Sequence, residues 1–100
     1  MATIQRLPYD TKRSKAFVII EDNGDKFLVF RNTPIAVLRA DNWLALSPGC
    51  SRSAYHHQTS FVSKYAPNVT MDIIYIMRAN QLSYNIETGA VSTQTILGIW

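Results

Sequence analysis

The stretch A-F-V-I-I-E-D-N-G-D-K-F-L-V-F, residues 16–30, contains two short runs of β-branched and aromatic residues on either side of an Asn-Gly pair. An Asn-Gly pair between two such runs is the strongest short-range signal for a β-hairpin. The sequence therefore predicts two antiparallel strands, at Ala16–Ile20 and Phe27–Phe30, which are joined by a turn around Asn23-Gly24.

Two further strands are predicted downstream of this hairpin. Thr33-Pro34 is expected to break the second strand, because proline lacks the amide donor of a sheet ladder and has a fixed φ. Ile35–Arg39 and Trp43–Leu46 are the next apolar runs, and turn residues at Asp41-Asn42 separate them. A meander of four short strands presents an apolar face, which has to be buried against another layer.

The residues that follow predict a helix that can supply this layer. Ser51 or Ser53 is a suitable N-cap. Arg52–Tyr65 contains neither Gly nor Pro, and Pro67 then stops the helix. At steps of three and four, the predicted inner face consists of Ala54, Tyr55, Gln58, Phe61, Val62 and Tyr65. The predicted outer face consists of Arg52, His56, Ser60, Ser63 and Lys64.

The last third of the chain predicts a second hairpin. Val69–Met77 is rich in β-branched residues and favours a strand, although Thr70 could also cap a short helix. Leu82–Glu87 and Val91–Ile99 predict paired strands around a turn at Thr88-Gly89. The predicted fold class is α+β: a small antiparallel sheet, built from an N-terminal meander and a C-terminal hairpin, packed against one main helix.

The charges of the chain are unevenly distributed. Its 100 residues, 47% hydrophobic and 17% charged, suit a single domain with a real core. Residues 1–15 contain four basic residues and one acidic residue, which accounts for the whole formal net charge of +3. We therefore predict a basic N-terminal arm at residues 1–15 and one α+β domain at residues 16–100. Between Asp41 and Asp72 there is no acidic residue, so the predicted helix is locally positive.

The composition also indicates where the protein is located. The single cysteine, Cys50, cannot form an internal disulfide, which is typical of a reducing compartment. Apolar runs such as Phe17–Ile20 are far shorter than the roughly 18 residues that indicate a membrane-spanning helix. Met1–Tyr9 lacks the apolar centre of a secretory signal. We therefore expect a cytoplasmic protein without membrane association.

Two histidines and one cysteine are the obvious candidates for chemistry. Neighbouring helical residues point about 100° apart, so His56 and His57 cannot share one metal ion. Cys50 lies just before the helix, where the helix dipole can favour a thiolate, but no orienting carboxylate is near in sequence. An enzyme that uses Cys50 or His57 is therefore the least favoured function. No motif predicts a metal or a cofactor.

Two motifs carry a resemblance to a family. The first is F-R-N-T-P-I-A at residues 30–36, and the second is S-R-S-A-Y-H-H at residues 51–57, followed by Phe61. With them the chain resembles a group of small bacteriophage and mobile-element proteins. Those proteins pair a strand that ends in Tyr-x-Thr-Pro-(Val or Ile)-Ala with a helix start that reads Ser-x-Thr-Thr-x-x-His.

The resemblance points to six motif residues of unknown role, which are Asn32, Thr33, Pro34, Ser51, Ser53 and His57. The chain departs from the pattern at Arg31, where the family has tyrosine, and at Ser53-Ala54, where it has two threonines. The resemblance implies a phage accessory protein, which would act in the cytoplasm of the host cell. It implies no particular activity.

The preferred function is a non-enzymatic binding module, and nucleic acid is the first candidate partner. Basic side chains can neutralise backbone phosphates in a sequence-independent way. The residues predicted to make such contacts are Lys12, Arg13 and Lys15 in the arm, and Arg52, His56 and Lys64 on the helix. A solvated tail and an ordinary polar helix surface are the alternative interpretations.

A protein is the second candidate partner. In this alternative the chain inhibits a host or anti-phage defence complex through Trp43, Tyr55 and Trp100, because aromatic residues dominate the energetics of interfaces. Self-association is a further expectation. Residues 79–100 carry a single charge, Glu87, and can leave an exposed edge strand or an apolar patch.

Overall fold

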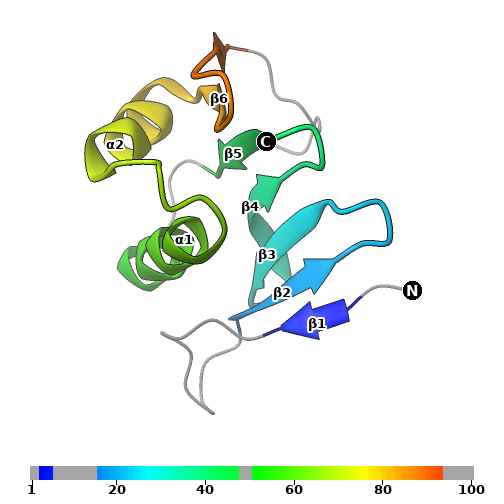
Figure 1. The fold of residues 1–100 in the computed structure, drawn as a ribbon. Coiled ribbons are helices and arrows are strands. Elements are labelled where there is room, and N and C mark those ends of the chain that lie inside the picture. Colours follow the sequence, from blue (N-terminus) through cyan, green and yellow to red (C-terminus); the bar gives the residue numbers. More distant parts are fainter. Residues whose placement is uncertain (1–2, 6–15, 48–50, 94–100) are drawn as a thin grey trace.

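The computed structural model describes residues 3–5, 16–47 and 51–93, which form a two-layer α+β domain. Within these residues a seven-stranded antiparallel sheet runs in chain order, and both helices lie on the same side of it (Figure 1). The strands are β1 Thr3–Gln5, β2 Ala16–Ile20, β3 Lys26–Phe30, β4 Thr33–Leu38, β5 Trp43–Leu46, β6 Ser83–Asn85 and β7 Val91–Ser92. The helices are α1 Arg52–Tyr65 and α2 Met71–Asn80. The predicted α+β class with an antiparallel sheet is confirmed.

The sheet extends beyond the predicted domain boundary at residue 16. Strand β1 pairs with β2, with Thr3 opposite Ile20 and Gln5 opposite Val18. Residues 3–5 of the predicted basic arm therefore belong to the folded domain. The basic residues of the arm, at positions 6–15, lie outside the described residues.

The predicted hairpin is present as β2 and β3, and its turn is stabilised by local hydrogen bonds. Gly24 has a φ of +96° and donates its N–H to the carbonyl of Glu21 at 3.0 Å. Asp25 connects this turn to the turn between β4 and β5, because its Oδ1 accepts the N–H of Ala40 at 2.7 Å. The two loops at this end of the sheet are therefore held together.

A two-residue turn, Arg31-Asn32, joins β3 to β4. Both residues have positive φ, 50° and 66°, and Phe30 pairs with Thr33 across the turn. This is type I′ geometry, which matches the twist of the flanking strands. Asn tolerates the left-handed region better than most residues. The motif residue Asn32 therefore has a conformational role in this turn.

Replacing Asn32 with glycine is expected to raise the free energy of unfolding by about 0.5 kcal/mol, because glycine has no Cβ to strain at positive φ. Asn32→Val is expected to lower it by about 1–2 kcal/mol, because a β-branched residue is disfavoured in the left-handed region. Urea unfolding followed by circular dichroism measures both changes. Equal stabilities of the two variants would contradict the role in the turn.

Strand β4 begins at Thr33 rather than at the predicted Ile35, so the expected break at Thr33-Pro34 is wrong. Pro34 pairs with Val29, and the register then shifts and leaves Ile35 without a paired residue in β3. Proline is tolerated at such bulges because one ladder donor is lost there anyway. The carbonyl of Ile35 accepts the N–H of Ser47 at 2.9 Å, which ties the bulge to the end of β5.

The strand expected at Val69–Met77 is also wrong, because these residues form most of α2. Thr70 is the N-cap, and its Oγ1 accepts the N–H of Ile73 at 3.4 Å. Ile74 and Met77 lie three residues apart, are 2% and 1% exposed, and belong to the core. Burial of this helical pair outweighs the β preference of the isoleucines, since β propensities span only about 1 kcal/mol.

The C-terminal hairpin is shorter than predicted within the described residues. Strand β6 lies between β5 and β7, so it joins the hairpin to the N-terminal meander. Asn85 Oδ1 accepts the N–H groups of Glu87 and Thr88, both at 3.0 Å, and Gly89 supplies a φ of +78°. The predicted second strand extended to Ile99, and its part from residue 94 on lies outside the described residues.

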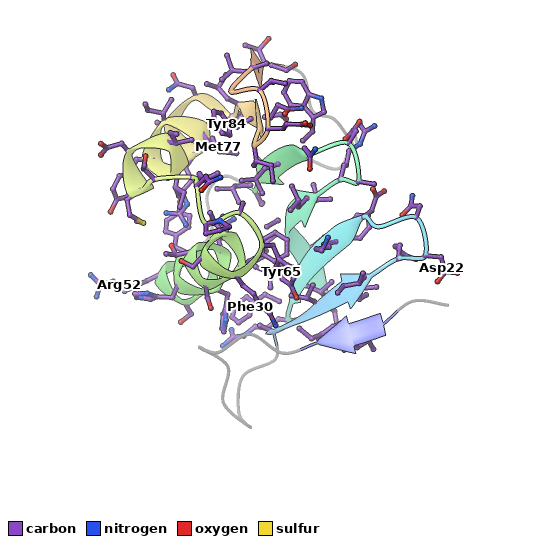
Figure 2. All side chains as sticks on the ribbon, viewed as in Figure 1. Asp22, Phe30, Arg52, Tyr65, Met77 and Tyr84 are labelled. Atoms are coloured by element: carbon purple, nitrogen blue, oxygen red, sulfur yellow. The ribbon has the colours of Figure 1, made fainter. Side chains whose placement is uncertain are left out.

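The core lies between the helices and one face of the sheet. Its largest fully buried apolar side chains are Phe61, Leu28, Leu44, Ile74 and Met77. Figure 2 shows Phe30 and Tyr65 between α1 and the sheet, and both pack against this core. One continuous core holds both helices on the sheet, so the outer face of α1 is presented by a fixed support.

Candidate binding surface on helix α1

Helix α1 begins at the predicted position, and Ser51 is its N-cap. Ser51 has an extended backbone, and its Oγ accepts the N–H of Ala54 at 3.2 Å. Ser53, the other predicted cap, is exposed in the first turn. No acidic residue occurs in that turn, so the positive end of the helix dipole has no carboxylate of α1 beside it.

The two histidines of α1 point in different directions. His56 is exposed, whereas His57 is 4% exposed and its ring lies 5.0 Å from the ring of Phe30. Helical geometry thus separates them, as the sequence predicts. The buried residues of α1 are Ala54, His57, Gln58, Phe61 and Val62. Tyr55 and Tyr65, which were also predicted for the inner face, are half-buried.

Gln58 is the polar centre of the contact between α1 and the sheet. Its side chain is fully buried, and Nε2 donates to the carbonyls of Ile35 at 2.7 Å and Ser47 at 3.1 Å. Its Oε1 accepts a hydrogen bond from Arg78 Nε at 2.9 Å. A buried amide with this many partners fixes the position of α1, because a shift of the helix would break bonds of a polar side chain that has no access to water.

Arg78 connects α2 to the same network, and no sequence pattern predicts this role. Its Nη2 donates to the carbonyl of Tyr55 at 3.1 Å, and its guanidinium carbon lies 4.2 Å from the centre of the Tyr55 ring. These contacts span 20 and 23 residues of sequence. The only local signal is a single base in the last turn of a mostly apolar helix.

The two sequence motifs meet at this network. The ring of Phe30 contacts His57, and the carbonyl of Ile35 accepts from Gln58. Asn32 and Thr33 are exposed at the hairpin turn, and Pro34 lies at the bulge. The motif residues thus shape the β3–β4 hairpin and hold the start of α1 against it.

The outer face of α1 is polar and free of carboxylates. Its exposed residues are Arg52, Ser53, His56, Ser63 and Lys64, and Ser60 is half-buried. Figure 2 shows Arg52 pointing away from the sheet. Lys64 Nζ lies 5.3 Å from the centre of the Tyr65 ring. We call these six residues the α1 outer face. It contains three of the predicted nucleic-acid contacts, Arg52, His56 and Lys64, and all three are exposed.

The other predicted binding residues do not gather on this surface. Trp43 is half-buried in β5 and precedes Leu44, which faces the core. Because side chains alternate along a strand, Trp43 lies on the sheet face opposite Tyr55. These two predicted protein anchors do not form one surface. Five further candidate residues lie outside the described ranges, and these are Lys12, Arg13, Lys15, Cys50 and Trp100.

Two kinds of feature are missing from the described part of the chain. Among residues 3–5, 16–47 and 51–93, no three His, Cys, Asp or Glu residues come together in a group that could hold a metal ion. Neither helix in these ranges is long and apolar enough to cross a membrane.

Comparison with known proteins returned no relative: no protein-family model matches the chain, and no match was found among curated proteins or among solved structures. The resemblance to bacteriophage and mobile-element proteins stays a prediction.

Proposed function

We propose that the protein is a non-enzymatic binding module that holds a nucleic-acid backbone against the α1 outer face, with help from its basic arm. The observation that carries this proposal is the exposure of Arg52, His56 and Lys64 on a helix face that contains no acidic side chain. In keeping with the resemblance, we place this activity in a small phage-type accessory protein of the host cytoplasm.

The distances along α1 suit contacts to several phosphates. Arg52 and Lys64 are separated by twelve residues, or about 18 Å at 1.5 Å per residue. The positive end of the helix dipole lies beside Arg52 and adds to its field. Serine hydroxyls at positions 53 and 63 are exposed on the same face and can donate to phosphate oxygens.

The rigidity of α1 supports the same function. Gln58 and Arg78 bind the helix to the sheet and to α2, so the outer side chains project from a fixed backbone. Backbone contacts position a protein on nucleic acid but carry no sequence information. We therefore propose binding with little sequence preference. The basic residues of the arm would add further phosphate contacts.

Affinity for a labelled DNA duplex is expected to fall steeply with salt. If Lys12, Arg13, Lys15, Arg52 and Lys64 each neutralise one phosphate, the slope of log K against log salt is about −4.5. Arg52→Gln and Lys64→Gln should each reduce the steepness of this slope by about 1. Fluorescence anisotropy between low and moderate salt measures the slope.

Arg39→Gln is the matched control for these two substitutions. Arg39 belongs to the loop after β4 and pairs with Asp41 at 2.8 Å, away from the α1 outer face. Its loss should leave the slope unchanged. Replacing Lys12, Arg13 and Lys15 by glutamine tests how much the arm contributes to the slope. None of these three residues belongs to β1. Absence of binding to duplex and single strand at low salt would refute the proposed function.

A further inference from the structure

The sheet has a second apolar face, on the side away from both helices (Figure 1). Leu28, Leu38 and Leu44 point towards the helices as part of the core, and side chains alternate along a strand, so the neighbours of these residues point the other way. An antiparallel sheet with one side in water alternates apolar and polar residues, so apolar runs indicate burial on both sides. We call this second side the outer sheet face, and its residues in β2 to β5 include Phe17, Ile19, Phe27, Val29, Val37, Trp43 and Ala45.

Burial on the outer sheet face is concentrated towards one end of a row of paired residues. From β1 to β7 this row consists of Ile4, Ile19, Phe27, Val37, Ala45, Ser83 and Ser92. Ile4 is 67% exposed, whereas Val37 is 0%, Ala45 3% and Ser83 2% exposed. Burial is therefore centred on β4, β5 and β6 and does not extend to Ile4 on β1.

The layer that covers this face belongs to the same chain, because Val37 and Ala45 are buried within a single copy of the protein. Both helices of the described residues lie on the other side of the sheet (Figure 1). Phe27 and Trp43 stand beside these two residues on the outer sheet face and are half-buried themselves. Neighbours in one sheet shield a side chain at its flanks, whereas its tip is covered only by another layer. This places the cover among the residues outside the described ranges, which are 1–2, 6–15, 48–50 and 94–100.

Residues 94–100 have the composition that suits this position. They read Q-T-I-L-G-I-W, with four large apolar side chains and no charge. Residues 6–15 join β1 to β2 at the exposed end of the row, and five of these ten residues are charged, so their burial would be costly. Residues 1–2 also adjoin β1, and residues 48–50 link β5 to α1 on the helix side.

The topology brings residues 94–100 to the buried end of the row. Ser92, near the end of the described chain, belongs to the row itself and pairs with Ser83. Val37 lies three strands from β7, or about 14 Å at about 4.8 Å per strand. Seven residues span up to roughly 23 Å when extended. The segment is therefore long enough to cross Ser83 and Ala45 and to reach Val37.

We propose that residues 94–100 fold back over the outer sheet face and pack on Ala45 and Val37. The sheet then lies between two layers, with the helices on one side and this segment on the other. The contact is separate from the α1 outer face and does not depend on the proposed function. Trp43 and Trp100, two of the predicted protein anchors, then belong to the interior of this protein rather than to an interface.

Nuclear Overhauser effects in the full chain test this contact directly. The methyl protons of Val37 and Ala45 should show cross-peaks to apolar side chains of residues 94–100. A mixture of isotope-labelled and unlabelled protein should show no such cross-peaks between copies. Cross-peaks found only between copies would place the segment of a second copy on this face, and a complete lack of cross-peaks would leave the face to another cover. Either result overturns the proposal.

Accessibility of Trp43 gives a second test. Trp100→Phe leaves Trp43 as the only tryptophan of the chain. In this background, replacement of Ile96, Leu97 and Ile99 together by asparagine should raise the acrylamide quenching constant of Trp43 at least about twofold, because the segment loses its apolar contacts with the sheet. An unchanged quenching constant in this folded variant overturns the proposal.

Ile4→Asn is the matched control for the asparagine substitutions. Ile4 lies at the exposed end of the same row, so its replacement should leave the quenching constant of Trp43 unchanged. Circular dichroism checks that each variant keeps its helices. If the triple variant does not fold, the cross-peaks of the parent protein decide between the outcomes.

Discussion

Phe61→Ala is expected to lower the free energy of unfolding by about 3–5 kcal/mol. Phe61 is fully buried in α1, and its ring lies 5.2 Å from the ring of Tyr65. Alanine removes the apolar contacts of the ring and leaves a cavity that rigid neighbours fill only in part. Because small domains have a total stability of about 5–15 kcal/mol, this variant should unfold at a much lower urea concentration.

A graded series separates loss of packing from disruption of the helix. Phe61→Leu keeps most of the apolar volume and should cost less than about 1.5 kcal/mol. Val91→Ala changes an exposed residue and should stay within about 0.5 kcal/mol of the parent. Urea unfolding followed by circular dichroism gives all three values. A loss below about 1 kcal/mol for Phe61→Ala would show that Phe61 is not central to the core.

The parts of the fold that the sequence predicts correctly depend on local signals. Asn23-Gly24 shapes its turn through local contacts, because Gly24 has a positive φ and Asn23 Oδ1 accepts the N–H of Asp25 at 3.0 Å, and strands β2 and β3 pair on either side of it. Helix α1 has a serine cap at one end, a proline just beyond the other, and an apolar period between them. None of these signals needs information about distant residues.

Helix α2 was only the alternative interpretation of its segment, in which Thr70 caps a short helix, and local signals did not decide for it. Its residues include Ile73, Ile74 and Ile76, which suit a strand as well as a helix by local preference. The outcome depends on which side chains find space in the core. Ile74 and Met77 pack there on one helical face, and Thr70 then caps the helix. Packing between distant segments is not visible in a nine-residue window.

In the candidate site, too, local signals predict some features, whereas others depend on contacts between distant segments. Helical period alone places Arg52 and His56 on the outer face and turns His57 about 100° away from His56. By contrast, Arg78 reaches Gln58 and Tyr55 across the contact between two helices. A prediction of that contact needs the relative position of α1 and α2, which the expected strand at Val69–Met77 excluded. The role of Arg78 was therefore not predicted for the same reason that α2 was not: the segment was expected to be a strand.

Gln58→Leu is expected to lower the free energy of unfolding by about 2–4 kcal/mol, although leucine has a similar size and is apolar. The carbonyl of Ile35 keeps its bond from the Ser47 N–H, whereas the Ser47 carbonyl and Arg78 Nε each lose the contact with Gln58. The cost therefore comes from two partly buried polar groups, each of which loses one hydrogen bond that leucine cannot replace. Chemical unfolding of both proteins measures it, and Ser63→Ala is the exposed control on α1.

Two further substitutions separate this network from simple packing. Gln58→Glu can still accept from Arg78, but it has no donor for the carbonyls of Ile35 and Ser47 and repels both. It should therefore destabilise the protein despite the new ion pair. Arg78→Met should cost less in the Gln58→Leu background than in the parent, with a coupling energy of about 0.5–3 kcal/mol. Additive costs would mean that the two side chains act independently, and Gln58 and Arg78 would not form the link that fixes α1 to α2.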